Sequence, residues 1–136
     1  MKLILCLDDR RGMMFNGRRQ SADRVLRERI ENLSEGQKLY MSSYSAKQFE
    51  NKFDNIVTNT DFFDIYDQNA FYFAEDRPFS FERADEIIIY RWNRHYPADV
   101  FCTDDPVAMG FSLYSIEEFP GSSHEKITEE KYRKQL

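Results

Sequence analysis

The chain of 136 residues suits one compact domain, residues 1–136, and its 41% apolar and 15% aromatic content excludes a disordered chain. The longest apolar run, residues 3–7, is too short to span a membrane, and two cysteines are too few for a disulfide scaffold. With a net charge of −5 as well, we expect a soluble, cytoplasmic protein.

The first part of the chain alternates strand-like and helix-like segments. Lys2–Leu7 is a continuous apolar run, which is typical of a strand buried on both faces. Residues 8–20 contain turn formers and four arginines and predict a long surface loop. An apolar stripe then predicts a helix over residues 21–34, with Ser21 as its N-cap and Gly36 ending it.

Strands dominate the rest of the chain. A short helix is expected from the serines at 42–45 to about residue 51, residues 60–69 show no clear period, and residues 128–134 fit a capped helix or a polar edge strand, of which we favour the helix. Further strands are predicted at 38–41, 55–58, 70–74, 86–92, 100–103 and 111–116. The order of elements predicts an α/β three-layer sandwich with a mixed central sheet, parallel at first and antiparallel towards the end.

Charge is distributed unevenly along the sequence. The first 30 residues carry eight basic and four acidic side chains, a balance of +4, and the other 106 residues carry −9. Such an asymmetry can focus an anionic ligand on one face of a soluble protein. A solvated basic surface is the alternative.

The arginine-rich loop is the best candidate binding site. Arg10, Arg11, Arg18 and Arg19 bracket Met13, Met14, Phe15 and Asn16. Guanidinium groups can hold a phosphate or a carboxylate while an aromatic ring stacks on a base. Alternatively, the methionines and the phenylalanine fill the core beneath solvated arginines.

Three acids form a second candidate site. Asp8, Asp9 and Asp23 can meet where the first strand ends and the first helix begins, a place where α/β proteins commonly bind ligands. Asp23 could orient a donor group or act as a base there. Simple complementation of the helix dipole by Asp23 is the alternative.

The two histidines are candidate catalytic residues. His95 lies in the cationic and aromatic string 91–96, which fits either stacking on a ligand or packing. His124 follows Ser122 and Ser123, but neighbouring side chains rarely point at one another, so we expect this string to cap a helix rather than to catalyse. Two histidines and two cysteines are too few for an ordinary zinc site, and we predict no metal.

The order of segments resembles the dihydrofolate reductase fold. The resemblance rests on LILCLDDRRGMMFNGRRQSADRVL, KLYMSSYSAKQF, ADEIIIYRWNRHYPADVFCTDD and FSLYSIEEF. It implies that Gly12 and Asn16 match the substrate loop, that Asp23 lies near the acid that faces the pterin, and that the second segment matches the cofactor phosphate site.

Two departures from that family bear on its chemistry. The reductases place a Gly-Gly pair after their fifth strand, where the backbone approaches the dinucleotide, and this chain has Glu75 and Asp76 there. The Pro–aromatic pair that normally follows the loop asparagine is replaced by residues 18–20, RRQ. We therefore expect no nicotinamide cofactor.

A second resemblance concerns the strings FNGRRQS, IIYRWNRHYPAD and GSSHEKIT, which are similar to short bacterial proteins labelled ribonuclease Z. The enzyme of that name holds two zinc ions with a His-x-His-x-Asp-His motif and further histidines, which this chain lacks. The label therefore implies no mechanism here.

Three functional hypotheses follow from the sequence. The first is a non-redox binding or interaction module for a small anionic or nucleotide-like ligand. The second is a small enzyme, either a divergent reductase or a metal-independent ribonuclease that uses His95 or His124 on RNA. The third is a homodimer whose aromatic surface is mostly interface.

Overall fold

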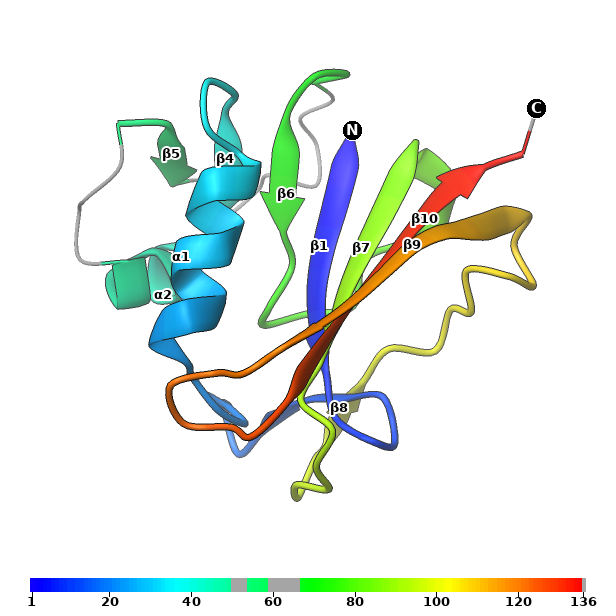
Figure 1. Ribbon diagram of the computed structural model, residues 1–136. Coiled ribbons are helices and arrows are strands. Elements are labelled where there is room, and N and C mark those ends of the chain that lie inside the picture. The colour runs from blue at the N-terminus through cyan, green and yellow to red at the C-terminus, as the bar shows by residue number, and fades with distance from the viewer. Residues whose placement is uncertain (50–53, 59–66, 136) are drawn as a thin grey trace.

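The computed structural model describes residues 1–49, 54–58 and 67–135. Within these residues the chain forms a seven-stranded sheet of order β5-β4-β6-β1-β7-β10-β9 (Figure 1). The strands are β1 (Lys2–Leu7), β4 (Leu39–Met41), β5 (Ile56–Thr58), β6 (Phe71–Phe73), β7 (Glu86–Arg91), β9 (Phe111–Phe119) and β10 (Ile127–Lys134). The five strands from β5 to β7 pair in parallel, and β10 is antiparallel to both β7 and β9. The predicted change from parallel to antiparallel pairing is confirmed.

Strand β1 lies between β6 and β7, and its side chains alternate between two cores. Leu3 and Leu5 belong to one core, and Ile4 and Cys6 belong to the other. A continuous apolar run is what a strand needs when both of its faces are covered. The prediction of a buried central strand is confirmed, since no residue from Leu3 to Leu7 is more than 6% exposed.

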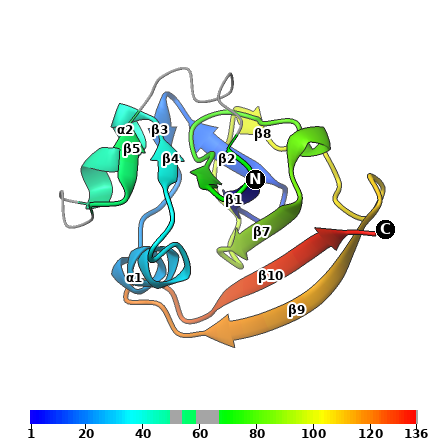
Figure 2. The same ribbon diagram turned by 90° about the horizontal axis from the view of Figure 1, so that it is seen from above.

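Different elements cover the two faces of the sheet (Figure 2). One face packs against α1 (Arg24–Leu33), α2 (Ser43–Ala46) and the 3₁₀ turn η1 (Lys47–Phe49). Met13 and Met14 cover the other face, together with the 3₁₀ turn η3 (Phe81–Arg83). That second layer contains a small sheet of order β3-β2-β8, formed by β2 (Gly12–Phe15), β3 (Arg18–Arg19) and β8 (Val100–Phe101). The three-layer α/β arrangement is as predicted.

The predicted surface loop at 8–20 is wrong for most of its length. Strands β2 and β3 form a hairpin there, with Asn16 (φ 52°) and Gly17 (φ 73°) at its turn. Positive φ at both turn residues suits the twist of a two-residue hairpin. The hairpin is ordered because β2 also pairs with β8 and buries Met13 and Met14.

The first helix is shorter than predicted. It begins at Arg24, and its N-cap is Asp23, whose carboxylate accepts hydrogen bonds from the backbone N–H groups of Val25 and Leu26. Ser21 is not the cap, because its hydroxyl contacts His124 instead. The helix ends at Leu33 with Ser34 as C-cap, shortly before Gly36.

The predicted C-terminal helix is wrong, because residues 127–134 form strand β10. This strand lies between β7 and β9, so both of its edges are hydrogen-bonded. Its polar residues Glu129 and Glu130 are accommodated by partners on other elements, Arg29 and Arg91 respectively. Pairing on both sides overrides the local helical propensity.

The remaining predictions hold with small changes of boundary. The strand expected at 111–116 extends to Phe119, and the one expected at 100–103 is only Val100–Phe101 and belongs to the small sheet. The expected helix end near residue 51, and most of 60–69, lie outside the described residues. Cys6 and Cys102 are free and buried. No helix among the described residues has the length and apolarity needed to cross a membrane.

Candidate functional site

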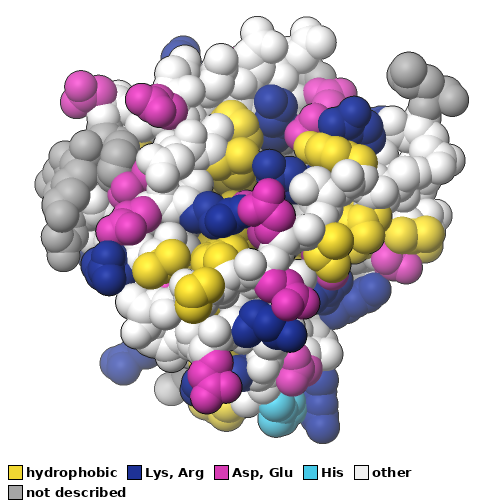
Figure 3. Space-filling view, viewed as in Figure 1, with side chains coloured by type: hydrophobic (Ala, Val, Ile, Leu, Met, Phe, Trp, Pro, Cys, Tyr) yellow, Lys and Arg dark blue, Asp and Glu magenta, His cyan; other side chains and the backbone are white. Residues whose placement is uncertain are grey.

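Half of the eight basic side chains in residues 1–30 are paired with acids in the described structure. Four arginines form these ion pairs, namely Arg11 with Asp105, Arg19 with Glu75, Arg24 with Glu28, and Arg29 with Glu117 and Glu129. Figure 3 shows positive and negative side chains interleaved on the face that carries α1. In the described part of the chain, Arg10, Arg18 and Arg27 have guanidinium groups without such a partner. The charge balance of the sequence therefore overstates the free positive charge.

Asp8, at the end of β1, has a buried carboxylate that organises the following turn. It accepts hydrogen bonds from the backbone N–H groups of Gly12 (2.6 Å), Arg10 (2.9 Å) and Tyr96 (3.3 Å), and from the side-chain amide of Gln20 (3.0 Å). Burial opposes its ionisation, but these bonds outweigh burial and lower the pKa of Asp8. A Cβ at Gly12 would lie 2.8 Å from the Asp8 carboxylate, so the turn requires glycine.

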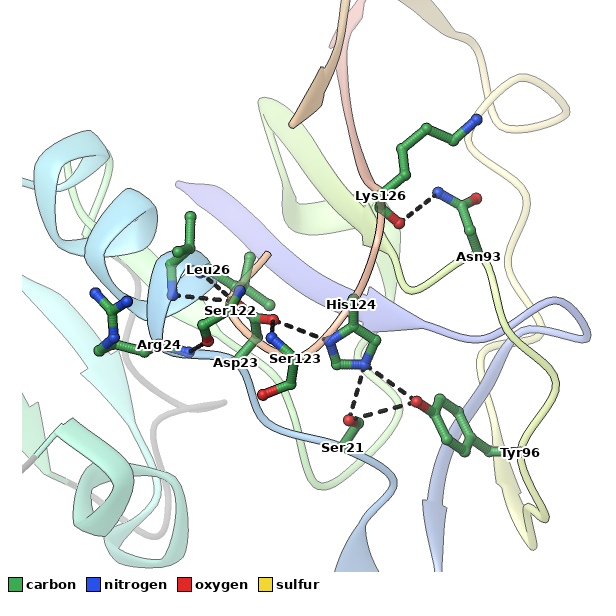
Figure 4. A network of polar contacts seen from close by, with 11 residues as sticks. Ser21, Asp23, Arg24, Leu26, Asn93, Tyr96, Ser122, Ser123, His124 and Lys126 are labelled. Atoms are coloured by element: carbon green, nitrogen blue, oxygen red, sulfur yellow. Dashed lines mark hydrogen bonds and ion pairs between the residues drawn. The ribbon is translucent and has the colours of Figure 1, made fainter. Parts of the chain in front are cut away.

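Asp23 is the N-cap of α1, and it contacts His124, which lies in the turn between β9 and β10 (Figure 4). Its Oδ2 lies 2.9 Å from His124 Nδ1, and its carboxylate also accepts the backbone N–H groups of Ser122 (3.0 Å) and Ser123 (2.8 Å). Burial opposes ionisation of Asp23, but the bonds from His124 and the two amides hold its pKa well below the usual range. Gly121 has no side chain, and a Cβ there would overlap this carboxylate.

His124 is buried, at 4% exposure, and both of its ring nitrogens are hydrogen-bonded. An ionised carboxylate can only accept, so Nδ1 carries the hydrogen that faces Asp23. In the neutral ring, Nε2 is then the acceptor, and it lies 3.0 Å from both the Ser21 hydroxyl and the Tyr96 hydroxyl. Trp92 stacks on the imidazole with ring centroids 4.6 Å apart, which fixes the plane of the ring.

These contacts place a serine, a histidine and an aspartate in the order used for nucleophilic catalysis.

Asn93 holds the neighbouring segment in place, since its amide donates to the Lys126 carbonyl (3.1 Å) and to the Thr128 hydroxyl (2.9 Å). Ser122 Oγ accepts a hydrogen bond from the backbone N–H of Arg24, at the start of α1. The serines at 122 and 123 therefore cap α1, and the segment that follows them is strand β10 and not a helix. The predicted capping role is right, but the predicted helix is wrong.

The cleft between α1, η1 and the sheet is nearly closed, and it contains a further buried carboxylate, that of Glu75. Glu75 follows β6, and Arg19 donates to its Oε2 (3.0 Å) and Oε1 (3.3 Å). Ser45 and Gln48 each donate to the same carboxylate at 2.9 Å. The remaining cavity has a volume of about 10 Å³, which is room for one water molecule. Burial, together with the nearby Glu75 charge, raises the pKa of the Cys6 thiol, so it stays protonated.

A larger pocket of about 290 Å³ lies beside the β2–β3 hairpin. Its lining combines positive charge with aromatic and amide groups, from Phe15, Asn16, Arg18, Arg19, Gln20, Tyr96 and Pro97. Phe15 is 47% exposed, and Arg18 is exposed and has no side-chain partner within the described ranges. The Arg19 guanidinium, in contrast, lies over the Tyr44 ring at 4.4 Å and is paired with Glu75.

The structure divides the predicted site residues into separate groups. Asn16, Arg18 and Arg19 line the hairpin pocket, whereas Arg10 and Arg11 do not. Asp23 and His124 lie together. Asp9 is exposed and takes no part in the hydrogen bonds around Asp8 or around Asp23. His95 is exposed and makes no side-chain contact with described residues. The described residues hold no group of three or more His, Cys, Asp and Glu suited to a metal ion.

Sequence reasoning missed Ser21 as a partner of His124, and it missed Tyr96. Ser21 is 103 positions from His124 and Tyr96 is 28 positions away, so no local spacing could reveal either contact. The alternative in which methionines fill the core is confirmed for Met13 and Met14 but wrong for Phe15, which is exposed. In the string 91–96, Trp92 packs in the core and Arg91 pairs with Glu130.

No protein-family model matches the chain, and no curated protein matches its sequence. A solved structure with similar architecture is dihydrofolate reductase from Enterococcus faecalis complexed with NADP(H) and RAB-propyl, with a TM-score of 0.64. The match covers 100% of this chain and 97% of the reductase at 9% sequence identity. At this identity the similarity shows the fold alone. The chain therefore has a dihydrofolate reductase-like fold, and the ribonuclease Z resemblance stays an observation on sequence.

Proposed function

We propose that this protein binds a small anionic or nucleotide-like molecule in the hairpin pocket, on a reductase-like scaffold and without nicotinamide chemistry. The observation that carries this proposal is Arg18, an exposed guanidinium without an ion-pair partner in the described chain, which lines a pocket of about 290 Å³ beside the exposed ring of Phe15. A guanidinium can bind phosphate or carboxylate oxygens through two hydrogen bonds, and an aromatic ring can stack on a base. The pocket offers both kinds of contact within a few residues.

The solved reductase is complexed with NADP(H), and the residues of this chain do not fit that cofactor well. Glu75 is buried after β6, with Asp76 beside it, and the cleft there retains about 10 Å³. A dinucleotide phosphate would meet carboxylates there, and it would have to displace the Arg19–Glu75 ion pair. These features support a ligand site at the hairpin instead of in the cleft.

The alternative of a metal-independent ribonuclease has no comparable support. An acid and a base on opposite sides of a phosphate must both reach the substrate. His124 is buried with Asp23 on Nδ1, and His95 is exposed without a contact to it. The homodimer hypothesis stays a prediction from sequence.

Titration calorimetry with ADP and with pyrophosphate tests the proposal. We expect both probes to bind, and we expect Arg18→Gln to weaken both at least about tenfold, because a charged hydrogen bond is worth about 1.5–3 kcal/mol. Arg94→Gln is the matched control, since Arg94 is also exposed and its side chain makes no contact with described residues. Phe15→Ala should weaken ADP alone, because pyrophosphate has no base to stack.

Three results would reject the proposal: no binding of either probe, equal affinity for the Arg18→Gln variant, or equal losses in Arg18→Gln and Arg94→Gln. A thermal shift with NADPH is the companion measurement. A rise in melting temperature with NADPH that persists in Arg18→Gln would mean that the dinucleotide binds outside the hairpin pocket. It would contradict the hypothesis of binding without nicotinamide chemistry.

A further inference from the structure

We propose that Ser21 is the nucleophile of an acyl-transfer site in which His124 is the general base and Asp23 positions the histidine. The proposal goes beyond ligand binding and rests on a different set of contacts. Ser21 Oγ lies 3.0 Å from His124 Nε2, and His124 Nδ1 lies 2.9 Å from Asp23 Oδ2. Figure 4 shows the imidazole between the two side chains, with one nitrogen facing each.

The surroundings hold the histidine in the orientation that a base requires. Asp23 is fixed by the backbone N–H groups of Ser122 and Ser123 and caps α1, so its carboxylate cannot turn away without breaking several bonds. Trp92 stacks on the ring and restricts its rotation. With Nδ1–H directed at Asp23, the lone pair of Nε2 faces the hydroxyls of Ser21 and Tyr96. Asp23 is a positioning residue, because it reaches the substrate only through His124.

Tyr96 supplies a donor beside the nucleophile. Its hydroxyl lies 3.0 Å from His124 Nε2 and 3.5 Å from Ser21 Oγ. A donor in this position can stabilise the oxyanion that forms when Ser21 attacks a carbonyl carbon. Tyr96 is partly exposed and lines the hairpin pocket, and so does Gln20, the neighbour of Ser21 in the chain. Ser21 is itself partly exposed and lies at the edge of the cavity of about 10 Å³, so the proposal requires the ester to approach it from the side of Tyr96 and the hairpin pocket.

The reaction balances without a cofactor. The Ser21 oxygen forms a bond to the carbonyl carbon of an ester while its proton moves to His124 Nε2. The ester C–O bond breaks, and the leaving alcohol takes that proton, which leaves an acyl group on Ser21. Water then attacks the acyl carbon and gives a proton to His124 Nε2; the bond between the acyl carbon and Ser21 Oγ breaks, His124 returns the proton to Ser21 Oγ, and the free acid leaves. The substrate class is a small carboxylic ester. If the ester also carries an anionic group that Arg18 binds, that part of the proposal rests on the proposed function.

The test uses p-nitrophenyl acetate, an uncharged ester, so that its outcome does not depend on anion binding. We expect the full chain to release nitrophenol and to carry an acetyl group on Ser21, seen by peptide mass spectrometry after acid quenching. Ser21→Ala should lose at least about 90% of the rate above the buffer background, and Ser21→Cys should regain acylation because a thiol can replace the hydroxyl. Ser43→Ala is the matched control, since Ser43 is exposed on α2 and makes no side-chain contact with described residues.

Further variants separate catalysis from structure. Tyr96→Phe should lower the acylation rate constant more than it changes the KM, because the oxyanion exists only after attack. Asp23→Asn should displace the pH profile of acylation, which loss of packing alone would not do. Circular dichroism of each variant verifies folding. A rate in Ser21→Ala equal to that of the wild type, an acetyl group mapped to another residue, or no adduct in the folded wild type would overturn the proposal, and none of these results depends on whether ADP binds.

Discussion

The closed cleft and the hairpin pocket use charge differently. In the cleft, Arg19 and two further donors satisfy Glu75, and about 10 Å³ of space remains. In the pocket of about 290 Å³, Arg18 has no partner in the described chain. Both arginines line the pocket, but the Arg19 guanidinium is also paired with Glu75 of the cleft. Charges that are already paired hold the fold together, whereas an unpaired one is available to a ligand.

Among substitutions of charged residues, the largest effect on stability should come from breaking the ion pair that closes the cleft. Arg19→Met leaves the Glu75 carboxylate buried at 6% exposure with only neutral donors, and we expect it to lower the free energy of unfolding by about 3 kcal/mol. Arg18→Met is the matched control and should change it by less than about 0.5 kcal/mol, because the side chain is exposed. Urea unfolding measures both. Similar losses in the two variants would contradict the comparison.

A smaller effect concerns acid. Because the pKa of Asp23 is lowered in the folded state, the unfolded chain takes up a proton first as the pH falls. The stabilisation is therefore complete above the usual carboxyl range and is lost as the pH falls through that range towards the folded pKa. Asp23→Asn should cost about 2 kcal/mol at pH 7 and progressively less below about pH 4.

Urea unfolding of the wild type and of Asp23→Asn at several pH values checks this prediction. Asp23 also lines the closed cleft. Asp9→Asn is the control, because the Asp9 side chain is exposed and makes no contact with described residues. A difference between wild type and Asp23→Asn that stays constant with pH would show that the carboxylate charge does not stabilise the fold.

The smallest effect on stability is expected in the open pocket. Phe15→Ala removes a ring that is 47% exposed, and we expect a loss within about 0.5 kcal/mol in urea unfolding. Phe49→Ala, in the wall of the cleft and 2% exposed, should cost about 3–5 kcal/mol and provides the contrast. A loss above about 2 kcal/mol for Phe15→Ala would mean that the ring belongs to the core and is not kept for a ligand.

Part of each candidate site could be predicted from the residues. The carboxylates of Glu75 and Asp76 predict a cleft that does not suit a dinucleotide, and the arginine string predicts a binding site in the segment that forms the hairpin; both stay predictions. Which arginine is free could not be predicted, because Arg18 and Arg19 are the same residue type on one short strand. Their difference comes from Glu75 and Tyr44, which are distant in sequence. The same is true of Asp23, whose partner His124 is 101 positions away.

The sequence by itself determined the central strands, because a run such as Lys2–Leu7 or Ile87–Ile89 buries enough apolar surface to require a place between two covered faces. Only the tertiary structure decided that polar residues 127–134 form a strand and that Ser21, His124 and Asp23 meet. Apolar periodicity is a local property of the chain. A hydrogen bond between distant segments depends instead on where the packed core places their ends.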